Sequence, residues 1–137
     1  MHLLLDSAPG YISNHMAAAW DIMPTFAEIL KTNAATDGIS FLPELIGKKQ
    51  FETHDYLYWE FPENEGSIAI RMDNWKGIVE NVHKGNKNMQ LFDLYTDPAE
   101  LFDVAKQHPD IVTRLEEKIR EARVKAEVER FRFPFDE

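Results

Sequence analysis

The sequence predicts an α+β fold in which a pair of N-terminal helices precedes a four-stranded antiparallel sheet and a long C-terminal helix. Two helical patterns flank a middle part in which short segments of β-branched and aromatic residues alternate with short polar loops. The last segment places apolar residues at helical spacing and charged residues elsewhere. A chain of 137 residues with 44% apolar and 28% charged side chains can bury an ordinary globular core.

Composition excludes several classes of function. The formal net charge is -9, and nucleic acids and anionic membranes both favour clustered Lys and Arg, so we expect neither as a partner. The absence of cysteine excludes disulfides, zinc–thiolate sites and a cysteine nucleophile. No apolar run approaches the ~18 residues that a membrane helix needs. Met1–Asp6 has no basic flank and makes a poor signal peptide, and the compartment stays open.

The N-terminal helices are predicted from caps and periodicity. Residues 1–14 carry turn residues without a period and are interpreted as an irregular lead-in. Ala17–Leu30 is predicted to be helical, with Asp21 as its cap and an apolar stripe on one side. That stripe consists of Ile22, Phe26, Ile29 and Leu30. Ser40–Ile46 is predicted to be a short helix that Ser40 caps.

Four strands are predicted in the middle of the chain. They are Tyr56–Phe61, Ser67–Met72, Trp75–Val82 and Met89–Leu94. Alternation is clearest in the second, where Ile68, Ile70 and Met72 share one side. The connecting loops are short and rich in Asp, Asn and Gly, which favours an antiparallel meander.

Two helical segments are predicted after the sheet. Asp97 and Glu100 are interpreted as a capping box around a turn that begins at Pro98. Pro109–Val128 is predicted to be an amphipathic helix. Its exposed side pairs opposite charges at four-residue spacing, Glu116 with Arg120 and Glu121 with Lys125. The aromatic tail Phe131–Phe135 is expected to pack back on the sheet.

The residues alone form no complete catalytic constellation. Ser7 lies two positions before Pro9, and a plain turn is favoured over a nucleophile there. The histidines lack metal-ligand spacing; they are His2, His15, His54, His83 and His108. Asp93, Asp97 and Glu100 lack the spacing of a calcium loop, and capping explains the last two. No metal ligand is therefore predicted.

Two places in the sequence are candidates for binding an anion. Arg71, Trp75 and Lys76 flank one tight hairpin, and a cation over an indole beside a second cation suits an anionic sugar or a sulfate group. Ordinary cross-strand packing is the favoured alternative for these three. His54 and Asp55 could line a pocket, with a surface pair as the default interpretation.

Five segments in chain order resemble motifs of the sulfatase family. Asp21–Ile29 resembles the family's D-x-x-P-T-x-x-x-[IL] helix, and Asp37–Gly47 resembles its D-G-x-S-[FL]-x-P-x-[LI]-x-G segment. His54–Phe61 is similar to the strand that opens the smaller C-terminal domain of these enzymes. Ala69–Lys76 resembles the A-[IV]-R-x-x-x-[WY]-K hairpin, and Leu91–Glu100 resembles L-[YF]-D-L-x-x-D-P-x-E. Five motifs in the family's order make the resemblance specific.

The resemblance covers the C-terminal end of a sulfatase. It implies an enzyme family that hydrolyses sulfate esters in an alkaline-phosphatase-like α/β domain, with a formylglycine nucleophile and a divalent ion, usually calcium. Both lie upstream of the matching part. Ser7–Tyr11 lacks the arginine of the family's C/S-x-P-S/A-R motif, and Asp73-Asn74 is interpreted as a hairpin turn rather than the family's metal-binding pair. No catalytic residue, metal ligand or cofactor is therefore expected in this chain.

The resemblance also divides the chain. Residues 1–50 are expected to be a remnant of the catalytic α/β domain edge, and residues 51–137 the sulfatase C-terminal domain. Leu3–Gly10 departs from the family pattern, from which we expect a truncated, rearranged or remnant gene. The expected function is that of a C-terminal sulfatase fragment, inactive alone. Members of the family are often periplasmic or secreted.

Two further roles stay open as alternatives. Apolar side chains suited to face a catalytic domain predict a homo-oligomer, and Trp20, Phe26 and Phe41 carry this prediction. Sulfated carbohydrate is the second expected partner. Its candidate binding residues are His54, Arg71, Trp75 and Lys76.

Overall fold

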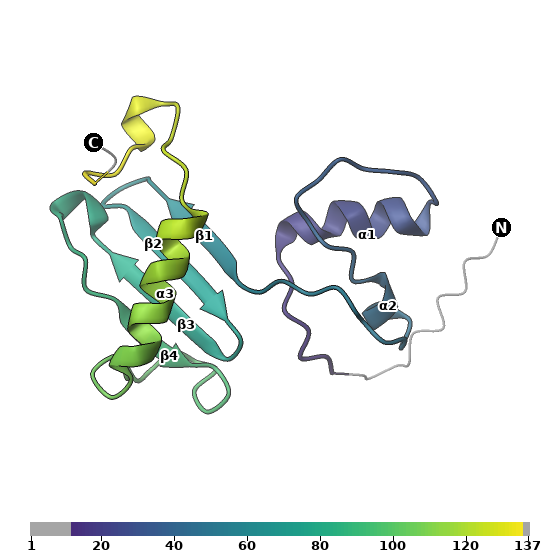
Figure 1. Ribbon diagram of the computed structural model, residues 1–137, viewed down its shortest axis with the longest axis horizontal. Coiled ribbons are helices and arrows are strands. Elements are labelled where there is room, and N and C mark those ends of the chain that lie inside the picture. The colour runs from purple at the N-terminus through teal and green to yellow at the C-terminus, as the bar shows by residue number, and fades with distance from the viewer. Residues whose placement is uncertain (1–11, 136–137) are drawn as a thin grey trace. The chain divides into compact units, whose positions relative to one another are not determined.

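The computed structural model describes residues 12–135 and forms two compact units, one ending at Asp55 and the other beginning at Tyr56 (Figure 1). The elements in chain order are η1 (Ala19–Asp21), α1 (Ile22–Ile29), α2 (Leu42–Leu45), β1 (Leu57–Phe61), β2 (Ser67–Met72), β3 (Trp75–Glu80), η2 (Val82–Lys84), β4 (Gln90–Asp93), α3 (Pro109–Ala122) and η3 (Glu129–Phe131). Helices in the first unit and a helix-backed antiparallel sheet in the second confirm the predicted α+β class. No helix in this described range is long and apolar enough to cross a bilayer.

Both N-terminal helices are shorter than the sequence predicted. A 3-10 turn, η1, occupies the start of the first, and α1 ends at Ile29. Lys31 follows with a φ of 54°, a left-handed conformation that terminates helices. The second helix is a single turn, α2, preceded by Ser40, whose Oγ accepts a hydrogen bond from Leu42 N at 3.3 Å. Local turns close both helices, since Thr32 N donates to Ala27 O at 2.9 Å and Lys48 N donates to Pro43 O at 2.8 Å.

Asp21 holds the first unit together, and its predicted role as a helix cap is wrong. Its side chain makes no capping bond to α1 and is 1% exposed. Oδ2 accepts a hydrogen bond from Ala18 N at 2.7 Å, and Oδ1 accepts one from Ile39 N at 2.8 Å. His54 Nε2 also lies 2.8 Å from Oδ1. One buried carboxylate thus joins η1, the loop before α2 and the segment before the sheet.

Two neighbouring residues reinforce this junction. The Thr25 hydroxyl donates to Asp21 O at 2.7 Å and accepts from Phe41 N at 3.1 Å, so it bridges α1 to the chain entering α2. Gly38 lies so close to the backbone of η1 that a Cβ there would be 2.3 Å from Trp20 O. A backbone carbonyl cannot rotate away as a side chain can, and glycine is therefore required at this position.

The second unit is built on a four-stranded antiparallel sheet in the order β1-β2-β3-β4. All four predicted strands are present, with bounds that differ by no more than two residues from those expected. Asp73 has a φ of 54°, which permits the tight turn between β2 and β3. The predicted meander is confirmed because each strand pairs with the next along the chain.

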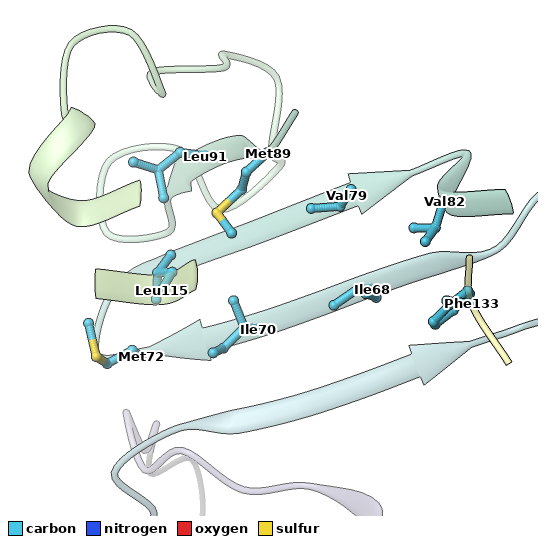
Figure 2. Packing of buried hydrophobic residues seen from close by; sticks show 9 residues of the cluster. All are labelled: Ile68, Ile70, Met72, Val79, Val82, Met89, Leu91, Leu115 and Phe133. Carbon is cyan, nitrogen blue, oxygen red and sulfur yellow. The ribbon is translucent and has the colours of Figure 1, made fainter. Parts of the chain in front are cut away.

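The core lies on one face of this sheet, beneath α3. Figure 2 shows the cluster of buried side chains contributed by strands, helix and tail: Ile68, Ile70, Met72, Val79, Val82, Met89, Leu91, Leu115 and Phe133. Leu115 of α3 is fully buried among them. Gly77 makes room for this packing, since a Cβ there would lie 2.5 Å from Met89 Sδ and 3.1 Å from Leu115 Cδ1.

The last helix ends at Ala122 and not at Val128 as predicted. Arg123 takes an extended conformation, and its Nε donates to Glu60 Oε1 on β1 at 2.9 Å. Its guanidinium carbon also lies 5.0 Å from the ring centre of Phe133 and 4.0 Å from that of Phe135. The tail packs back on the sheet, as expected, because Phe133 is 2% exposed within the core.

Two local predictions near the C-terminal part are wrong. Asp97 and Glu100 do not form a capping box: Asp97 Oδ2 accepts from Leu101 N and Phe102 N, while Glu100 has a φ of 57° and pairs with Lys76. The expected four-residue ion pairs along the last helix are also replaced. Within residues 12–135, the ion pair along α3 joins Lys118 to Glu121 at 2.6 Å.

Folding changes the acidity of Asp21. Burial on its own raises the pKa of this carboxyl, but hydrogen bonds from Ala18 N and Ile39 N, together with the adjacent His54, outweigh it and hold the pKa below its ordinary value of 3.8. A carboxylate whose pKa is lowered by folding stabilises the folded state above its unfolded pKa. That stabilisation is lost as the pH falls through the lower, folded value.

We therefore expect Asp21→Asn to destabilise the first unit by about 1–3 kcal/mol near neutral pH, because an amide cannot accept all three hydrogen bonds. The variant should also lose stability less steeply than the wild type below about pH 4. Hydrogen exchange of the Ile39 amide reports both effects. Asp37→Asn, which changes an exposed carboxylate of the same unit, is the matched control. Equal protection of Ile39 in the two variants would contradict this assignment.

Candidate functional site

The two predicted basic residues of the hairpin lie side by side on the sheet. Arg71 of β2 pairs directly with Lys76 of β3. The same cross-strand row continues to Leu57 of β1 and Phe92 of β4, which are 2% and 6% exposed. Because side chains alternate along a strand, and Ile70 and Gly77 face the core, this row lies on the opposite face of the sheet. Two cations are thus placed between buried apolar neighbours.

The two cations differ in how far their charge is neutralised. Lys76 Nζ donates to both carboxylate oxygens of Glu100, at 2.6 and 2.7 Å, and both side chains are partly buried. Arg71 Nε donates to Asp73 O at 3.4 Å. Among residues 12–135, Arg71 has no ion-pair partner, and its guanidinium keeps further N–H groups for an oxyanion.

Trp75 does not join this pair. It is the register partner of Met72 and packs against the core cluster, so its indole lies on the face of the sheet that α3 covers. Its ring centre is 4.8 Å from that of His108, the residue immediately before α3. Adjacent positions on one strand therefore send the indole and the Lys76 ammonium to opposite faces.

His54 belongs to the first unit, where it lies 2.8 Å from Asp21 and is 12% exposed. Within the described residues, the partner of His54 is the buried carboxylate of Asp21. The sequence had suggested a pair with the neighbouring Asp55. The pairing contributes to the lowered pKa of Asp21. This contact holds the imidazole against the carboxylate of Asp21 in the interior of the unit.

The remaining sequence candidates have local structural roles or lie elsewhere. Ser7 is outside the described residues. Asp93 accepts hydrogen bonds from Tyr95 N and the Thr96 hydroxyl, at 3.0 Å each, and therefore closes a turn. Asp97 binds the backbone of the following loop. Across residues 12–135, no group of three or more acidic or histidine side chains is arranged to hold a metal ion.

Sequence reasoning missed the partners of two site residues, Glu100 for Lys76 and Asp21 for His54. Both carboxylates stand where a helix-capping residue is expected, so local spacing explained their presence without a distant partner. The separations in sequence, 24 and 33 residues, carry no periodic signal. The one signal in the sequence for a special role of Asp21 was its place in the D-x-x-P-T motif, and this aspartate is buried in the structure.

The sulfatase-like motifs fall on successive structural elements. They supply η1 with α1, the loop leading into α2, strand β1, the β2–β3 hairpin and strand β4 with its following turn. Each motif therefore coincides with a helix, a strand or a loop of the described chain. A protein-family model described as N-sulphoglucosamine sulphohydrolase, C-terminal, matches residues 4–125.

Curated relatives agree with this match. The chain is 33% identical over 112 residues to an N-acetylgalactosamine-6-O-sulfatase of Bacteroides thetaiotaomicron, an alignment that covers 71% of this chain and 21% of the relative. It is 28% identical over 132 residues to the arylsulfatase K of Bos taurus, covering 85% of this chain and 24% of the relative. The chain thus spans between a fifth and a quarter of these two proteins.

Solved structures share the fold. A 2-O GAG sulfatase superposes with a TM-score of 0.61 at 23% identity, covering 74% of this chain and 24% of that structure. The phosphonate monoester hydrolase of Agrobacterium radiobacter superposes with a TM-score of 0.60 at 23% identity, covering 80% of this chain and 25% of that structure. On the family match over residues 4–125, the chain belongs to the N-sulphoglucosamine sulphohydrolase C-terminal family and is a C-terminal region of the sulfatases.

Proposed function

We propose that this chain serves as the C-terminal part of a sulfatase-type hydrolase and does not hydrolyse sulfate esters by itself. The observation that carries the proposal is the family match over residues 4–125, in a sequence that contains no C/S-x-P-S/A-R motif. That motif supplies the nucleophile precursor in the enzymes that the chain resembles. Sulfate-ester hydrolysis needs an activated nucleophile. In the segment that begins at Ser7, the position that the motif gives to arginine is occupied by Tyr11.

The structure supports a role in binding and packing. The second unit has a buried core of its own, with β-strands and α3 enclosing Leu115. The first unit presents large apolar side chains along α1, which are costly to leave in water. An element of this kind is suited to pack against further protein.

We expect the purified chain to release p-nitrophenol from p-nitrophenyl sulfate no faster than a buffer blank, with or without added Ca²⁺, because the nucleophile motif is absent. Colour release at 405 nm is the measurement. A longer sulfatase relative assayed beside it shows that the conditions permit turnover. Release that rises in proportion to protein concentration and disappears in Ser7→Ala would overturn the proposal.

We propose sulfated carbohydrate as a ligand of the second unit, bound through Arg71. The specific support is that Arg71 and Lys76 share one face of the sheet, and that only Lys76 is neutralised, by Glu100, within the described residues. Relatives are named for acting on N-acetylgalactosamine-6-O-sulfate and GAG substrates. Trp75 and His54, also candidates from the sequence, contact the core cluster and Asp21 respectively and are not part of this proposed site.

The expected ligand for a test is N-acetylgalactosamine 6-sulfate, titrated by calorimetry against unsulfated N-acetylgalactosamine. Arg71→Ala should weaken binding about tenfold, the effect of one charge-assisted hydrogen bond. Glu100→Gln should strengthen binding, because it frees the Lys76 charge. Arg114→Ala on the exposed side of α3 is the matched control. Equal or absent binding in wild type and Arg71→Ala removes the proposal.

We also propose that the chain self-associates through α1. Four apolar side chains of this helix and its end are exposed: Ile22 by 48%, Met23 by 61%, Phe26 by 59% and Leu30 by 71%. The sequence had named Trp20 and Phe41 beside Phe26, but these two are half-buried. Water is excluded from such a stripe when a second copy covers it.

Light scattering at high protein concentration is expected to give the mass of a dimer or larger assembly. Phe26→Asp should shift the mass toward the monomer, because a carboxylate in an apolar interface is costly to desolvate. Asn33→Asp introduces the same charge at an exposed position beyond the helix and should leave the mass unchanged. A monomeric wild type at every concentration would refute the proposal.

A further inference from the structure

A hollow of about 430 Å³ lies in the second unit, on the side of the sheet that carries the core. We call it the α3 hollow. Its apolar lining comes from two strands, the loop before β4, helix α3 and the tail, as Ile68, Val79, Met89, Ile119 and Phe135. Its volume falls within the range of small-molecule sites in proteins, roughly 300–1,000 Å³. None of the roles proposed above uses these residues.

The wall formed by Phe135 is held in place by contacts outside the hollow. Arg123 lies over the Phe135 ring with its guanidinium carbon 4.0 Å from the ring centre. The same guanidinium is fixed to Glu60 at 2.9 Å, and the ring of buried Phe133 is 5.7 Å from that of Phe135. An aromatic ring supported in this way presents a defined surface to a ligand, which lowers the entropic cost of binding.

The loop on the other side of the hollow is also ordered by hydrogen bonds. Asn86 Nδ2 donates to Glu80 O at 2.8 Å, and Asn86 Oδ1 accepts from Asn88 N at 3.1 Å. Between these two asparagines stands Lys87, which lines the hollow. Its backbone is therefore fixed while its long side chain stays exposed.

The charges at the rim are two cations and one carboxylate. Lys87 and Arg120 line the hollow together with Glu116. The expected Glu116–Arg120 pair does not form, and among residues 12–135 neither cation has an ion-pair partner. An apolar floor beneath two unneutralised cations is complementary to an apolar body that carries a negative charge at one end.

We propose that the α3 hollow binds a small organic monoanion with an aromatic body. The ring system would lie against Phe135 and Met89, whose polarizable sulfur makes favourable contacts with aromatic edges. The oxyanion would point to Arg120, which can form two parallel hydrogen bonds with it, and to Lys87. Glu116 disfavours a second negative charge on the ligand, which selects a monoanion.

Methionine methyl NMR tests the proposal on the intact chain with 2-naphthalenesulfonate as the probe. We expect the Met89 methyl resonance to shift in a saturable manner, and that of Met72, which does not line the hollow, to stay in place. The neutral 2-naphthalenemethanol should bind at least about tenfold more weakly, because it lacks the charge that the rim recognises. Inorganic sulfate alone should produce no shift of Met89.

Two substitutions at the rim are expected to change the affinity for the sulfonate in opposite directions. Arg120→Gln should weaken binding of the sulfonate about tenfold, and Glu116→Gln should strengthen it, because one removes an attractive charge and the other a repulsive one. Arg114→Gln and Glu117→Gln, exposed positions on α3 that do not line the hollow, are the matched controls.

Three results would overturn the proposal. The first is a dissociation constant weaker than about 1 mM for the sulfonate. The second is equal affinity for the charged and neutral probes. The third is the same affinity in Arg120→Gln as in Arg114→Gln. Unchanged resonances of Met72 in all variants verify that the core is intact, so loss of binding can be assigned to the rim.

Discussion

The antiparallel pairing of β2 with β3 places Ile70 beside Gly77 and Arg71 beside Lys76. Since side chains alternate between the two faces of a sheet, this one register sends an apolar set toward α3 and a pair of cations to the other face. A slip by one residue would reverse both sets and bury the cations. The turn at Asp73, with its positive φ, closes the hairpin in this register.

The rest of the second unit depends on the face that this register makes apolar. Gly77 lets Met89 and Leu115 approach the strand closely, which seats α3 on the sheet. The end of α3 is set in turn by β1, because Arg123 leaves the helix to bind Glu60. From there Arg123 orders Phe133 and Phe135, and the second of these becomes a wall of the α3 hollow. A polar contact at the sheet edge thus shapes an apolar site on the helix side.

The first unit is organised around a charge and has a smaller apolar interior. Asp21 is 1% exposed and is satisfied by two backbone N–H groups and His54. A buried carboxylate with these partners specifies one arrangement of the loops around it, since any other leaves an unpaired charge. Ile22, Met23 and Phe26 of α1 are exposed. The unit's stability and its association surface therefore rest on different residues.

The sequence by itself determined the α+β class, the order of the elements, the four strands to within two residues and the membership of the sulfatase C-terminal family, because these follow from hydrophobic periodicity, turn residues and motif order. Local capping rules then failed at Asp21 and Glu100, since both side chains bind partners far away in the chain. The predicted helix to Val128 ends early at Ala122, where Arg123 is extended and contacts Glu60 and the rings of Phe133 and Phe135, which are distant in sequence or follow the helix. Strand alternation alone puts Trp75 and Lys76 on opposite faces of the sheet. Only the tertiary structure decided which of the two residues packs against the core, because that depends on the face that α3 covers.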